Sequence, residues 1–273
     1  MRIFRSDIVS YLVAILLIVW VVFPLYYIVM LSLQPSRLAF SWPPAWLFVP
    51  TLDNYISVLL KSNFILQFRS SITVATGNTL LSLAIAIPSA YGLSRFPYRG
   101  KENISFWIMS ARMAPPIGLA VPFVILVRMF NGFDNPLTLI ALYLLPNLPI
   151  VVWMMKSFID DISVDLDNAA LVDGCSRWGA LRSICLPLAL PGILVTSLFN
   201  FIMSINEFVL AFVFMGRDWS TATVGLTGYI TPQGELWGPM AATGTLIMLP
   251  VLVFALIVRK HLVRGFLFGT VKG

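Results

Sequence analysis

The sequence predicts an all-α polytopic membrane protein with six transmembrane helices in a single domain, residues 1–273. Composition is the first observation, because 59% of the residues are hydrophobic and only 11% are charged. Soluble proteins carry about 25% charged residues, which cover their apolar core. A chain this poor in charge cannot cover its apolar surface in water, so the lipid bilayer is its expected solvent. The second observation is a set of six long apolar segments, and the third is an uneven distribution of Lys and Arg.

Each apolar segment reaches the roughly 20 residues needed to cross a hydrocarbon core of about 30 Å. The segments lie near residues 9–33, 71–93, 104–130, 137–158, 188–213 and 239–258. Prolines fall inside several of them, at Pro24, Pro88, Pro122, Pro146, Pro149, Pro191 and Pro250. Membrane helices tolerate proline where neighbouring groups satisfy the freed carbonyls. The prolines therefore predict kinks, which serve either packing or movement.

Lys and Arg predict the orientation, because they concentrate in cytoplasmic loops. With the N-terminus inside, twelve of them fall on the cytoplasmic side: Arg2, Arg5, Arg95, Arg99, Lys101, Lys156, Arg177, Arg182, Arg259, Lys260, Arg264 and Lys272. Five fall outside: Arg37, Lys61, Arg69, Arg128 and Arg217. We therefore expect both termini in the cytoplasm. The net charge of +6 reflects this asymmetry, and no basic run exceeds two residues, so we expect no nucleic-acid partner.

The polar segment 159–187 joins the fourth and fifth apolar segments. Ser163 is a favourable N-cap, Asp165 and Asp167 suit the first turn of a helix, and Gly174 is a typical left-handed terminator. Together they predict a helix of about ten residues, or roughly 15 Å. A helix this short is marginal in water. It therefore packs either on its own protein or on a docking partner.

Small residues, a glycine and a proline recur in this segment at a characteristic spacing. Ala169-Ala170 is followed by Gly174 and then by Ile184-Cys185-Leu186-Pro187. The spacing resembles the cytoplasmic signature of bacterial ABC-importer permeases, Glu-Ala-Ala followed by Gly and Ile-x-Leu-Pro, with Asn168 in place of the Glu. Further matches follow in order at residues 52–55, 90–100, 206–208, 262–265 and 271–273. In these motifs the chain is similar to the binding-protein-dependent sugar permeases, and within them to the smaller, maltose-permease-G-like member of a heterodimer.

The resemblance implies a type I importer permease fold that translocates a sugar, expected to be a di- or oligosaccharide, by alternating access. The partners it implies are a second homologous permease, two ABC ATPase subunits, an extracytoplasmic sugar-binding protein and membrane lipid. The short helix would be a coupling helix docked on an ATPase, with contacts from Asp167, Asn168, Ala169, Ala170, Asp173 and Gly174. The C-terminal tail would contact the ATPases through Lys272 and Gly273.

Catalytic and metal chemistry find no candidate residues in this chain. It has no Gly-x-x-x-x-Gly-Lys-Ser/Thr phosphate loop, so we expect a non-catalytic subunit without a cofactor, with ATP and magnesium bound by the partner ATPases. One histidine, His261, and two cysteines, Cys175 and Cys185, do not make a metal site. We expect a multi-pass subunit of the bacterial inner membrane. A polyol or a sugar phosphate is an alternative cargo.

Two ionisable residues, Arg112 and Glu207, fall inside predicted spans. A charge at that depth is costly and marks a cavity, a pathway or a buried pair. For Glu207 and its neighbour Asn206, a structural pair, a place on the sugar pathway and proton coupling all stay open. Arg112 is near enough to the cytoplasmic face to reach water. An ion-coupled transporter would need more such charges, and an intramembrane enzyme would need a metal triad or a nucleophile–base pair.

Overall fold

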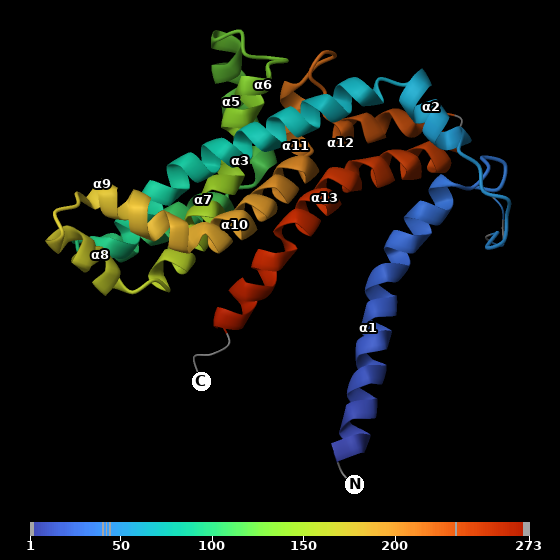
Figure 1. Ribbon diagram of the computed structural model, residues 1–273. Coiled ribbons are helices and arrows are strands. Elements are labelled where there is room, and N and C mark those ends of the chain that lie inside the picture. The colour runs from blue at the N-terminus through green and yellow to red at the C-terminus, as the bar shows by residue number, and fades with distance from the viewer. Residues whose placement is uncertain (1–2, 40, 42, 44, 233, 270–273) are drawn as a thin grey trace. The chain divides into compact units, whose positions relative to one another are not determined.

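The computed structural model of the chain describes residues 3–39, 41, 43, 45–232 and 234–269, with side chains described within 9–260 (Figure 1). Its helices are α1 (Ile3–Ser32), α2 (Asp53–Lys61), α3 (Phe64–Arg95), α4 (Lys101–Ser110), α5 (Pro116–Met129), α6 (Pro136–Leu142), α7 (Leu144–Asp160), α8 (Val164–Val172), α9 (Arg177–Ala180), α10 (Leu186–Asn206), α11 (Val209–Phe214), α12 (Ala222–Gly225) and α13 (Trp237–Gly269). Single helical turns lie between them at η1 (Ala111–Met113), η2 (Leu181–Cys185) and η3 (Leu226–Tyr229). The strands β1 (Ile230–Thr231) and β2 (Gly234–Glu235) form a short antiparallel pair, with Ile230 opposite Glu235.

Six stretches of the described chain are long and apolar enough to cross a membrane when each bent helix pair counts as one span. Four are unbroken: Val9–Ser32 in α1, Phe64–Arg95, Arg177–Asn206 and Trp237–Lys260 in α13. The other two are pairs, α4 and η1 with α5, bent by 90°, and α6 with α7, bent by 51°. The number and order of the predicted spans are therefore confirmed.

The predicted continuity of three spans is wrong. In segment 104–130 the bend lies at Pro115 and Pro116, which have no N–H group to continue a helix. In segment 137–158 the chain bends at Tyr143, between α6 and α7. In segment 188–213 the helix stops before Glu207, whose backbone is extended at φ −69° and ψ 123°. The position of a proline alone does not predict these bends, because α3, α5 and α10 contain prolines without a break.

The chain divides into two compact units, Met1–Ile65 with Gly225–Leu249 and Leu66–Val224 with Pro250–Gly273. In the first unit, Asn54 of α2 is buried against the end of α1. Its Nδ2 donates to the carbonyl oxygens of Ser32 and Gln34, both at 2.9 Å. The last carbonyls of a helix have no partner within the helix. Asn54 therefore satisfies the end of α1 and fixes α2 there.

The second unit is organised around Asn78 of α3, which is fully buried. Its Nδ2 donates to the carbonyl oxygen of Ile140 at 2.9 Å, just before the bend between α6 and α7. Its Oδ1 accepts from Nδ2 of Asn147 at 3.0 Å, Oγ of Ser204 at 3.0 Å and Nδ2 of Asn200 at 3.2 Å. One apolar cluster packs among α3, α7, η2 and α10, and another among α3, α5, α6 and α11. The network thus satisfies a carbonyl near the bend and ties four helices together.

Asp134 fixes the loop between α5 and α6 to the segment after α11. Its Oδ1 accepts from the backbone N–H groups of Gly216 at 3.0 Å and Trp219 at 2.9 Å, and its Oδ2 accepts from that of Asp218 at 3.0 Å. Partial burial raises the pKa of this carboxyl, but the backbone donors outweigh burial, so its pKa lies below the usual range. Ionised Asp134 therefore stabilises this pair of loops.

Candidate functional site

Both ends of α8 are defined by the residues that the sequence singled out. At the start, Oγ of Ser163 accepts from the backbone N–H of Asp165 at 3.2 Å. At the end, Gly174 has φ +87°, in the left-handed region. The N–H of Gly174 donates to the carbonyl of Leu171 at 3.1 Å, and that of Cys175 donates to Ala170 at 2.9 Å. This is the Schellman arrangement, which satisfies the last carbonyls of a helix. The predicted N-cap and terminator are confirmed.

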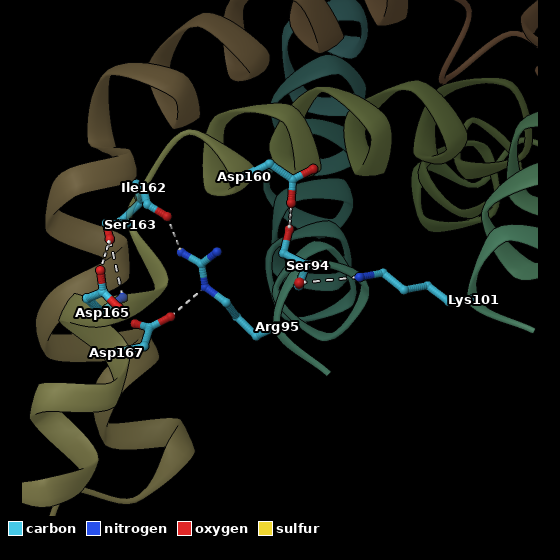
Figure 2. A network of polar contacts seen from close by, with 8 residues as sticks. All are labelled: Ser94, Arg95, Lys101, Asp160, Ile162, Ser163, Asp165 and Asp167. Atoms are coloured by element: carbon cyan, nitrogen blue, oxygen red, sulfur yellow. Dashed lines mark hydrogen bonds and ion pairs between the residues drawn. The ribbon is translucent and has the colours of Figure 1, made fainter. Parts of the chain in front are cut away.

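Arg95, the last residue of α3, contacts α8 from inside the protein (Figure 2). Its Nε donates to Oδ2 of Asp167 at 2.5 Å, and its Nη2 donates to the carbonyl oxygen of Ile162 at 2.8 Å. The two charged side chains are 2% and 0% exposed. The other carboxylate oxygen of Asp167 is buried and has no hydrogen-bond partner among the described residues. A buried charge is costly unless it is paired, so Arg95 is what stabilises Asp167 in this position.

A second set of contacts joins the same end of α3 to α7 (Figure 2). Oγ of Ser94 donates to Oδ1 of Asp160 at 2.6 Å, and Lys156 forms an ion pair with Oδ2 of Asp160. Nζ of Lys101 donates to the carbonyl oxygen of Ser94 at 3.3 Å. The side chains of Lys156 and Asp160 are 26% and 42% exposed, so water screens this pair more than the pair of Arg95 and Asp167. The end of α3 is therefore attached to both α7 and α8.

The six residues predicted for docking lie on two faces of this segment. Asp167 and Ala170 are buried, whereas Asn168, Ala169, Asp173 and Gly174 are exposed. Successive helical residues differ in direction by about 100°, which separates Asp167 from Asn168. The carboxylate of Asp167 is bound to Arg95 inside the chain, so it is not available for direct contact with another protein.

The exposed face of α8 also carries apolar side chains that the sequence analysis did not single out. They are Val164, Leu166 and Val172, with exposed fractions of 48%, 45% and 87%. Trp178 in α9 is 64% exposed. The loop therefore presents apolar groups together with the amide of Asn168 and the carboxylate of Asp173.

Glu207 lies at the break between α10 and α11. Its Oε2 accepts from the backbone N–H groups of Leu210 at 3.1 Å and Ala211 at 3.4 Å, so it caps the start of α11. Its carbonyl oxygen accepts from Oη of Tyr143 at 3.3 Å. Asn206 is exposed, and its Nδ2 donates to the carbonyl of Ile202 in the same helix at 2.8 Å. The structure therefore gives Glu207 backbone partners, and it does not bring the two side chains together.

Comparison with known proteins identifies the family. Residues 82–267, which include α8 and the break at Glu207, match the family described as binding-protein-dependent transport system inner membrane component. The chain belongs to this family. This permease is 30% identical to the trehalose/maltose transport system permease protein MalG of Thermococcus litoralis, with 95% of each chain covered. It is 28% identical to the diacetylchitobiose uptake system permease protein DasC of Streptomyces coelicolor, again with 95% of each chain covered.

The fold of the permease also has a solved counterpart. A chain in the crystal structure of a bacterial ABC transporter involved in the import of the acidic polysaccharide alginate matches it with a TM-score of 0.76 and 20% identity, over 95% of this chain and 96% of that chain. The predicted type I importer fold is confirmed, and the protein is the transmembrane permease subunit of an ABC importer. The predicted tail contacts, Lys272 and Gly273, lie outside the described residues.

Arg95 is the residue of this site that sequence reasoning missed. Its place in the sequence indicates only a cytoplasmic charge within a motif, without a partner. Its contact with Asp167 joins residues 72 positions apart, and no local spacing reveals such a pair. The available signal was indirect, because Asp167 lies one residue before the small Asn168-Ala169-Ala170 stretch and an acid on the packed side of a short helix needs a cation.

Proposed function

We propose that this permease is the translocating subunit of a sugar importer and that α8 is its coupling helix, docked on a partner ATPase. The observation that carries the proposal is the division of α8 into an inner face held by Arg95 and an exposed face with both ends capped. Relatives named for trehalose/maltose and diacetylchitobiose favour a di- or oligosaccharide as cargo. The whole chain acts as one transmembrane domain beside a second, homologous permease.

The exposed face of α8 suits a protein partner. Val172 is 87% exposed at its end, and burial of apolar surface drives protein association. Asn168 and Asp173 lie next to it and supply a neutral and a charged hydrogen-bonding group. Ala169 is small and allows close approach. Asp167 and Ala170 contribute through the position of α8, because both are buried in this chain.

The remaining roles follow from this arrangement. Two ABC ATPases bind ATP and magnesium and supply the energy, because the permease has no phosphate loop of its own and is a non-catalytic subunit. A sugar-binding protein delivers the cargo on the outer side of the bacterial inner membrane. Both termini lie in the cytoplasm with α8, as the Lys and Arg distribution predicts. Exposed Asn206 lies along the solute path, and Glu207 fixes the shape of the break beside it.

Photo-crosslinking tests this proposal directly. A photoreactive amino acid at Val172 should crosslink the ATPase in the assembled transporter, whereas one at Ile230, which is also exposed, should not. The control distinguishes the α8 side of the membrane from the β1 side. Crosslinks to the ATPase from Ile230 instead of Val172 would contradict both the docking and the orientation.

The C-terminal tail is a second contact in this proposal, by resemblance alone. Lys272 can donate hydrogen bonds and Gly273 carries a carboxylate. We expect deletion of residues 271–273 to change the rate of sugar-stimulated ATP hydrolysis without preventing assembly. An unchanged rate in the assembled complex would instead indicate a basic end near anionic lipid.

A further inference from the structure

The attachment of α8 to the spans depends on very few groups. Asp167 and Ala170 are its buried residues, and an alanine side chain buries little apolar surface. The turn before α8 and the residues after Gly174 connect it through the chain. The strongest lateral contact of α8 among the described residues is therefore the ion pair between Asp167 and Arg95.

We propose that Arg95 and Asp167 are positioning residues that fasten the coupling helix to the end of α3, so that α8, α3 and α7 move together at this side of the membrane. The inference rests on the proposed docking of α8 on an ATPase. Arg95 ends a membrane-spanning helix, and Ser94 beside it contacts Asp160 at the end of α7. A displacement of α8 therefore reaches two spans through side chains, in addition to the chain connection between α7 and α8.

The geometry of Arg95 suits this role. One guanidinium contacts two separate points, because Nε binds the carboxylate of Asp167 while Nη2 binds the carbonyl of Ile162, just before α8. The planar guanidinium holds such contacts in a fixed direction, whereas Lys has a single flexible nitrogen. The contact is also almost completely buried, so water does not compete for it. Arg95 thus fixes both the start and the inner face of α8.

Asp167 is matched to this partner alone. Its second oxygen is buried without a hydrogen bond among the described residues. The exposed pair of Lys156 and Asp160, by contrast, lies within α7 and does not join two helices. Replacing Asp167 by Asn leaves a buried guanidinium without its counter-charge, and removing one partner of a buried pair is strongly destabilising. The expected local result is an α8 that stays folded by its caps but is no longer held on α3.

The test uses the complete transporter, with its ATPases and binding protein, in proteoliposomes. For Asp167→Asn we expect sugar uptake per ATP hydrolysed to fall by about tenfold or more. Arg95→Lys, which keeps the charge, should change it in the same direction. Asp165→Asn is the matched control, because Asp165 is an exposed acid in the same helix that contacts Ser163. It should leave uptake per ATP within about twofold of the wild type.

Crosslinking from Val172 separates failure of this inference from failure of the docking. In Asp167→Asn, a retained crosslink to the ATPase with lost uptake per ATP supports the positioning role. A retained crosslink with normal uptake per ATP overturns it, as does an equal loss in Asp165→Asn. If Asp167→Asn does not assemble, the result for Arg95→Lys decides in the same way. Absence of the crosslink in the wild type would instead refute the proposed docking.

Discussion

Gly174→Val should uncouple the transporter through the backbone of α8. Gly174 has φ +87°, and L-residues with a side chain pay about 1–2 kcal/mol in this region. A Cβ added at Gly174 meets no atom of the chain within 4 Å, so the cost is conformational and not steric. Valine is branched at Cβ and should lie at the upper end, near 2 kcal/mol. Since about 1.4 kcal/mol is a factor of ten, the Schellman end becomes roughly thirtyfold less favoured.

The consequence reaches the proposed docking face, because the two capping hydrogen bonds leave from Gly174 and Cys175. When they are lost, the end of α8 that carries Val172 and Asp173 changes course. We expect sugar-stimulated ATP hydrolysis in proteoliposomes to fall by about tenfold for Gly174→Val and by severalfold for Gly174→Ala. The amount of permease inserted should stay the same.

Gly174→Asn is the control that separates backbone from side chain. Asparagine adopts the left-handed conformation far more readily than valine, so this variant should retain most of the stimulated hydrolysis. If Gly174→Asn is as damaging as Gly174→Val, the added side chain collides with a partner and the backbone argument is wrong. Normal stimulation by the valine variant would show that the end of α8 plays no part in coupling.

The other predictions concern docking, packing and pH. Asn168→Ala should weaken ATPase association by less than about tenfold in a binding assay, because a neutral hydrogen bond contributes about 1 kcal/mol; a hundredfold loss would contradict this. Gly192→Ala should lower the thermal stability of the permease in detergent by about 1–3 kcal/mol, because its Cβ would lie 2.7 Å from Cβ and Cδ2 of Phe158, whereas Gly92→Ala, with no atom within 4 Å, should not. Asp134 has a lowered pKa when folded, so its stabilisation is present above the unfolded value near about 3.9 and is lost as pH falls through the folded value. Thermal unfolding of the wild type should show this loss below about pH 4, and Asp134→Asn should reduce it.

The sequence predicted those features that local physical chemistry determines. The spans follow from apolar length, and α8 follows from Ser163 and Gly174, whose capping chemistry acts within a few residues. The break at Glu207 and the bend at Tyr143 depend on contacts from distant helices, such as the hydrogen bond from Asn78 to Ile140, 62 residues away. Those contacts have no periodic signal. For the same reason the prediction identified the docking segment but did not show which of its residues face inward.

The substitution at the signature position acquires a physical meaning from the orientation of α8. The family pattern has Glu where this chain has Asn168, and Asp167 beside it is an obvious replacement on paper. The structure excludes that compensation, because Asp167 is fully buried against Arg95 and points away from the exposed face. Asn168 is exposed but can offer a partner neutral hydrogen bonds only, which are weaker than charge-assisted ones. Docking of this permease must therefore depend more on Val172 and Asp173, and the acid beside the signature serves to hold the helix and not to bind the ATPase.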